Sequence, residues 1–244
     1  MHNGLMPKLT PQANHYGHDV SDRIPPTLTD VPVMTPQLAR VWERAAVLLR
    51  VRDNDAHTLY AFGLATALLD LYPNADAAVV LPAILLHDIG WSQVDPSEVL
   101  SAIAPGAGRP DLVLLHEREG ARMAADILTA TEYDPGRIDR IVEIIDGHDS
   151  RTNALSIEDA IVKDADKTWR LTPHGLDTVM DWFGLDRAQA LRLCASRVRP
   201  HLFTDGARTM AETLIALESV TLSRQLRALF QPDPDGPGPA LAAE

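Results

Sequence analysis

The chain has 244 residues, of which 45% are hydrophobic and 5% aromatic, so it can form one large domain or two small ones around a sizeable core. Its net charge of −12 argues against a nucleic-acid polymer as partner, because neutralising phosphates requires a basic face, but it allows a small anionic substrate in a local basic pocket. The single cysteine rules out an internal disulfide, and there is neither an apolar signal segment nor a stretch long enough to span a bilayer, so we expect a cytoplasmic protein.

The abundance of alanine and leucine and the helical spacing of apolar residues predict an all-α fold. Residues 1–34 contain five prolines and little periodicity, which indicates an extended or mobile arm. Thr35 and Pro36 mark the cap and the first position of a helix. A second helix is expected from about Asp55 to Leu71.

The stretch from Ala77 to Leu86 is apolar at every position. A helix that is apolar on all sides is buried in the core. His87 and Asp88 follow at its end, and we expect Gly90 to stop the helix. Burying an imidazole and a carboxylate side by side is costly unless something pairs with them, and a bound metal ion would remove that cost.

Local start signals predict the remaining helices, and composition predicts the tail. Helices are expected to begin at Asp95-Pro96, Leu112, Asp134-Pro135, Ser156, Thr172-Pro173, Asp186 and Asp205. Residues 231–244 are rich in proline and glycine, which is typical of a disordered segment. We therefore expect a single helical domain over residues 35–230, with its core at about 40–180, between flexible N- and C-terminal tails.

Six ionisable residues lie on apolar helix faces or at helix ends. They are His57, His87, Asp88, His116, His148 and Asp166. A lone histidine on such a face is usually a core residue, but helices that converge on one axis can aim such groups at a common point. Four imidazoles and two carboxylates suit Mn, Fe, Co, Ni or Zn, and they are enough for one or two divalent ions with a carboxylate between them.

The order of these six residues, with LLHDIG at 85–90, resembles the HD-domain superfamily of helical metal-dependent phosphohydrolases. IIDGHDS at 144–150, followed by IVKDADKTW at 161–169, looks like the YedJ-type branch of that family. Thr168-Trp169 departs from the Leu-Asp that usually follows there, which leaves the substrate open. The resemblance implies an HD-domain helical bundle.

The resemblance also implies which residues bind metal. The family's ligands match His57, His87, Asp88 and Asp166, whereas His116 and His148 match a pair that holds a second metal or contacts substrate. Asp166 rather than Asp164 matches the ligand, and Asp164 lies about 200° further round the helix, so the two cannot easily share a target.

The implied function is hydrolysis of a nucleotide or small phosphate ester through a metal-activated water, with Asp88 at the reacting centre. Lys167, together with Arg170 or Arg151, is predicted to meet a substrate phosphate. Lys167 could instead lie on a solvated face or pair with Asp164. Glu117, beside His116, is a candidate proton shuttle or else exposed helix surface.

Two other functions stay open. The six-residue set also resembles that of the mixed-valent di-iron oxygenases, such as myo-inositol oxygenase and the organophosphonate oxygenases, which would imply a small polar or phosphonate substrate. His15, Tyr16 and His18 could then belong to a lid over the site. The third candidate is a binding or regulatory module that keeps the fold without catalysis. The sequence favours no particular oligomeric state.

Overall fold

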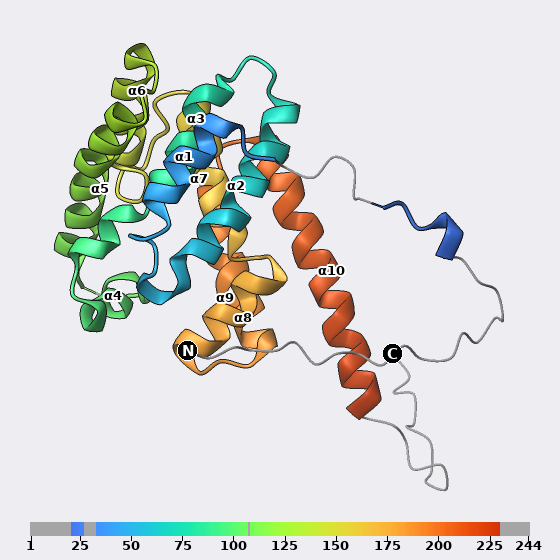
Figure 1. Cartoon of the computed structure of the whole chain (residues 1–244). Helices are drawn as coiled ribbons and strands as arrows, with labels where there is room; N and C mark the ends of the chain where they lie inside the picture. The colour runs from blue at the N-terminus through green and yellow to red at the C-terminus, as the bar shows by residue number, and fades with distance from the viewer. Residues whose placement is uncertain (1–20, 27–32, 107, 230–244) are drawn as a thin grey trace, which may run out of the picture. The chain divides into compact units, whose positions relative to one another are not determined.

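The computed structural model describes residues 21–26, 33–106 and 108–229, with side chains up to residue 223. Within these ranges the chain is helical and contains no β-strand, which confirms the all-α prediction (Figure 1). The chain divides between Val33 and Met34 into two units, and the first is described only at Val33 and around a 3-10 turn, η1 (Ser21–Arg23). The predicted lid residues and the 231–244 tail lie outside the described residues.

Helix α3 (Ala77–Leu86) lies at the centre of the second unit, as its apolar sequence predicts. It packs against α1 (Pro36–Ala45), α2 (Asn54–Leu71), α6 (Pro135–Ile145) and α7 (Ile157–Trp169). Pro82 within α3 has no N–H to donate to the Ala78 carbonyl, one turn earlier. The Tyr133 hydroxyl donates to that carbonyl instead, at 2.7 Å, so the oxygen is satisfied.

The other helices begin at the predicted signals, with one exception. These helices are α4 (Pro96–Ile103), α5 (Pro110–Ala130), α8 (Pro173–Phe183), α9 (Arg187–Val198) and α10 (Asp205–Leu229), with 3-10 turns η2 (Val51–Asp53), η3 (Ile89–Gln93) and η4 (Arg199–His201). The exception is α5, which begins at Pro110, two residues before the predicted Leu112. First-turn N–H groups donate to the side chains of Thr35, Asp95, Asp134, Ser156, Thr172 and Asp186. Among the described helices, none has the length and apolar character needed to cross a membrane.

The prediction that Gly90 stops the central helix is wrong. Helix α3 ends at Leu86, and Gly90 lies inside η3 without the positive φ of a glycine stop. A Cβ atom at Gly90 would lie 1.9 Å from the His116 carbonyl oxygen and 2.6 Å from the Gly120 nitrogen. Glycine is therefore required because η3 packs directly on the backbone of α5, which brings Asp88 close to His116.

Asp164 ties the C-terminal helices to α7. Its Oδ1 accepts a hydrogen bond from Phe203 N at 2.8 Å, and its Oδ2 accepts from the backbone N and the hydroxyl of Thr204 at 2.8 and 2.7 Å. This contact fixes the turn before α10, and α10 packs against α7, α9 and α2. Asp164 thus points away from the Asp166 side of α7, as the angle between the two positions predicts.

Candidate metal centre

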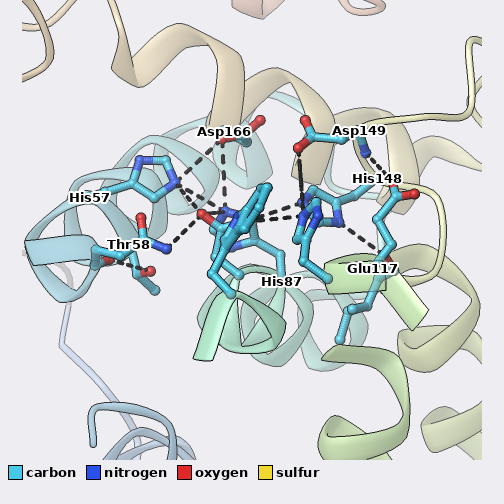
Figure 2. Close-up of polar contacts among 12 residues, drawn as sticks. His57, Thr58, His87, Glu117, His148, Asp149 and Asp166 are labelled. Atoms are coloured by element: carbon cyan, nitrogen blue, oxygen red, sulfur yellow. Dashed lines mark hydrogen bonds and ion pairs between the residues drawn. The ribbon is translucent and has the colours of Figure 1, made fainter. Parts of the chain in front are cut away.

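The first group of donors lies where α2, α3 and α7 meet. His57 Nε2 is 3.0 Å from His87 Nε2, 3.4 Å from Asp88 Oδ2 and 3.4 Å from Asp166 Oδ1 (Figure 2). His87 Nε2 is 3.4 Å from the same oxygen of Asp88. All four residues are buried, with exposed fractions between 0% and 8%.

The second group uses the other oxygen of Asp88. Asp88 Oδ1 lies 3.4 Å from His148 Nε2 and 3.8 Å from His116 Nε2, and the two imidazole nitrogens are 3.4 Å apart. Asp149 Oδ2 approaches to 3.6 Å from His116 and 3.8 Å from His148. Asp88 therefore belongs to two groups of donors. The donor atoms of the first group, His57, His87 and Asp88, lie within 4.8 Å of one another, and so do those of the second group, Asp88, His116 and His148.

The structure thus brings all six sequence-predicted residues together, each from the expected part of the chain. It adds Asp149, which sequence analysis missed. A signal was present, because His148-Asp149 repeats the His-Asp doublet of residues 87–88. That the six residues bind metal stays a prediction, and Asp149 joins them as a further candidate.

Backbone and side-chain contacts orient the donors from behind. His87 Nδ1 donates to the Ile84 carbonyl at 2.8 Å, and this bond leaves the lone pair of Nε2 facing the site in a neutral ring. Asn54 donates to Asp88 Oδ2 at 2.8 Å, and the Trp91 indole N–H donates to Oδ1 at 3.1 Å. Outer contacts of this kind are typical of metal ligands, because they fix the tautomer and the direction of each donor.

The carboxylates of the site are ionised at pH 7. Burial disfavours ionisation of Asp88, but the positive charge that His87 carries when protonated, and a hydrogen bond with His148, hold the pKa of its carboxyl well below the usual range. At Asp166, Arg170 outweighs burial in the same way and keeps the pKa well below its ordinary value. Burial lowers the pKa of His87 and His116, so both rings are neutral at pH 7. Ionised carboxylates therefore face imidazole lone pairs.

His148 differs from the other histidines. Burial alone would lower the pKa of its imidazole, but Asp149 and Asp88 raise it to about 9. Its Nδ1 donates to the Ile145 carbonyl at 2.9 Å, so Nε2 is the nitrogen that faces the carboxylates. A metal ion and a proton compete for that nitrogen.

The donors fit a transition-metal ion. Asp166 Oδ2 is buried and has no hydrogen-bond partner among the described residues. His57 Nε2 and His87 Nε2 lie 3.0 Å apart, and the lone pair of the His87 nitrogen points into the site. A buried carboxylate oxygen without a donor costs free energy. A divalent ion would accept electron pairs from this oxygen and from the imidazole nitrogens.

Two buried side chains fix the loop that carries His148 and Asp149. Glu117 Oε1 accepts hydrogen bonds from Asp149 N at 2.7 Å and Ser150 N at 2.8 Å. Lys163 Nζ donates to the carbonyls of Gly147, His148 and Arg151 at 2.6, 3.0 and 2.9 Å. Glu117 is 1% exposed, so the prediction that it could be helix surface is wrong.

The predicted phosphate-binding residues line a cleft of about 400 Å³ beside the metal centre. Arg170 and Asp149 border both the cleft and the metal pocket. Lys167 faces the cleft and contacts the Lys163 carbonyl at 3.4 Å, whereas the Asp164 carboxylate, its alternative partner, is engaged by Phe203 and Thr204.

Arg151 is held more firmly than a flexible substrate-binding side chain. Its guanidinium donates to the Asp146 carbonyl at 2.8 Å, to the Glu143 carbonyl at 3.1 Å and to Asp159 Oδ2 at 3.3 Å. It borders the cleft, but most of its donors are engaged by the protein. Arg170 and Lys167 are the freer of the three predicted cations.

The fold is helical, and it brings together buried donor groups that could hold a metal ion. Residues 54–171 match the family model of the HD domain, the family that the order of the histidines and aspartates predicts. A search of curated proteins finds no match to this chain.

Solved structures share the fold. A predicted HD-superfamily hydrolase from an uncultured Thermotogales bacterium has a TM-score of 0.56 and 20% identity, covering 80% of this chain and 94% of that one. An HD-superfamily hydrolase from Bacillus thuringiensis has a TM-score of 0.53 and 14% identity, covering 80% and 100%. A Lactobacillus plantarum protein has a TM-score of 0.52 and 16% identity, covering 81% and 99%. At these identities the likeness shows the fold.

Proposed function

We propose that this protein is a metal-dependent phosphohydrolase that acts on a nucleotide or another small phosphate ester. The observation that carries the proposal is the pair of donor groups that share Asp88, beside a cleft lined by Lys167 and Arg170. HD-superfamily hydrolases among the structural neighbours support a hydrolytic reaction.

Each residue has a defined part in this proposal. His57, His87 and Asp166 would hold one ion, and His116, His148 and Asp149 the other, with Asp88 serving both. A divalent ion in such a site acts as a Lewis acid and lowers the pKa of water toward neutrality. Arg170 and Lys167 would bind phosphoryl oxygens from the cleft side and stabilise their charge. Glu117 would position the loop of His148 and Asp149, because its oxygens already accept from that loop.

The test is phosphate release with defined metals. The chain, stripped with chelator and reloaded with Mn²⁺, Co²⁺, Ni²⁺, Zn²⁺ or Fe²⁺, is assayed on a panel of nucleotides and sugar phosphates. We expect release that requires the metal and is lost in Asp166→Asn but retained in Asp126→Asn, a change at an exposed aspartate. The absence of phosphate release with every metal and substrate class would contradict the proposal.

A di-iron oxygenase is the second candidate, and the same observation favours it, since two adjoining donor groups with a shared carboxylate can also hold two irons. Metal content and oxygen uptake separate the two. Two irons per chain with oxygen-dependent loss of a phosphonate or polyol substrate would select the oxygenase, whereas phosphate release under anaerobic conditions would select the hydrolase.

A further inference from the structure

Arg52 lines the metal pocket, and none of the roles above uses it. It lies in η2, five residues before His57. Arg52 and its neighbour Asp53 both have left-handed backbone conformations, with φ of 57° and 55°. Residues other than glycine rarely adopt this conformation, and it persists only where the surrounding structure enforces it, commonly at functional sites.

Two tryptophans hold the guanidinium of Arg52. Its Cζ lies 4.9 Å from the ring centroid of Trp182 and 5.6 Å from that of Trp91. Such contacts stabilise a cation against the face of an aromatic ring. The N–H bonds of a guanidinium lie in its own plane, so stacking fixes the group without engaging its donors.

Two nitrogen atoms of the Arg52 guanidinium lack a hydrogen-bond acceptor among the described residues. Its Nε and Nη1 are buried, and neither has a hydrogen-bond partner within the described part of the chain. Leaving charged donors unpaired in the interior costs free energy. Arg187 shows the contrasting case of a structural arginine, because its donors bind Asp177 and Glu218. The free donors of Arg52 therefore indicate a ligand.

The position of Arg52 identifies the ligand as an anion at the metal centre. Arg52, Asp88, Asp166 and Arg170 line one small pocket of about 30 Å³, which has room for about one water-sized group. Arg52 also borders a cleft of about 280 Å³, and Arg170 borders the separate cleft of about 400 Å³. A group in the small pocket therefore lies beside two guanidinium groups, that of Arg52 on the side of one cleft and that of Arg170 on the side of the other.

We propose that Arg52 binds a phosphoryl oxygen of the substrate, and of the phosphate product, at the metal centre. The choice of a phosphoryl group rests on the proposed function. A planar guanidinium can hold two oxygens of one phosphoryl group, which a lysine ammonium cannot do in the same geometry. The two tryptophans hold the guanidinium in place before substrate arrives, so little side-chain entropy is lost on binding.

Binding of inorganic phosphate to the full, Mn²⁺-loaded chain tests this role. The variants are Arg52→Gln and Arg52→Lys, and the control is Arg50→Gln, a change at an exposed arginine two residues earlier. Calorimetry should show the Kd for phosphate raised about 10- to 100-fold in Arg52→Gln, with Arg52→Lys between it and the control. Phosphate should change tryptophan fluorescence in the wild type and in Arg50→Gln, but not in Arg52→Gln. Mn²⁺ content should equal that of the control.

Phosphate affinity within twofold of the control in both Arg52 variants would overturn the inference. If Arg52→Gln unfolds or loses metal, Arg52→Lys decides, because it keeps the charge. Failure here is distinct from failure of the proposed function. Arg52-dependent phosphate binding without turnover of any ester would refute the hydrolase and leave the anion site standing. Ester hydrolysis that Arg52→Gln leaves unchanged, in rate and in KM, would refute the anion site alone.

Discussion

Lys163→Met should destabilise the fold and weaken the second group of metal donors. The ammonium of Lys163 is 0% exposed and donates to three carbonyls of the loop that carries His148 and Asp149. Burial lowers the pKa of Lys163 to about 8, so at pH 7 the charged form still predominates. Hydrogen bonds from a charged group contribute about 1.5–3 kcal/mol each, but burying the ammonium offsets several kcal/mol of the total.

The net cost should be about 3 kcal/mol, since methionine fills the space and leaves three carbonyls without a donor. For a domain of this size that corresponds to a fall in Tm of about 6–12 °C. Thermal unfolding followed by circular dichroism measures it, and elemental analysis after dialysis should show one bound ion per chain in place of two. Lys167→Met is the matched control, one turn further along the same helix, with an expected change below about 0.5 kcal/mol. Equal Tm and equal metal content in the two variants would refute the reasoning.

Three further predictions concern the site and its packing. Asp149→Asn should weaken one of the two ions about 10- to 100-fold while the ion held by His57 stays tight, as titration with Mn²⁺ would show; two unchanged affinities would remove Asp149 from the ligand list. Gly90→Ala should cost at least about 2 kcal/mol because its Cβ would meet the His116 carbonyl at 1.9 Å, whereas Gly63→Ala, with nothing within 4 Å, should not destabilise the chain in urea. Chelation should lower Tm, since each ion at 100 times its Kd adds about 2.7 kcal/mol; a Tm insensitive to chelator would contradict both donor groups.

Much of the fold could be predicted because its signals are local. A cap such as Thr35 or Asp134 acts on the first turn of its own helix, so both starts can be identified from a few residues. The apolar run of α3 predicts its burial for the same reason. Gly90 shows the limit of this approach, because its role depends on the approach of α5, which no pattern around Gly90 encodes.

The residues of the candidate site likewise fall into those that the sequence identifies and those that only the tertiary fold reveals. The six predicted residues follow from their order in the chain, and Asp149 could have been added from the repeated His-Asp doublet. Arg52 could not have been found from the sequence. The two tryptophans that contact it, Trp91 and Trp182, lie far along the chain, and no local pattern predicts the left-handed backbone conformation of Arg52. Lys163 was visible beside Asp166, but only the tertiary fold shows that its side chain reaches the loop after α6.

The distribution of charge shows how a chain with a net charge of −12 could bind the proposed anionic substrate. The carboxylates of Asp88, Asp149 and Asp166 carry three negative charges, and the two guanidinium groups of the metal pocket together with a protonated His148 carry three positive ones, so the residues alone provide no net attraction for an anion. Two divalent ions, one of which would replace the proton on His148, would make the centre positive, and the guanidinium groups would then act together with the metals on an anion. Anion binding should therefore depend on prior metal binding, with the metal ions binding first and the anion second.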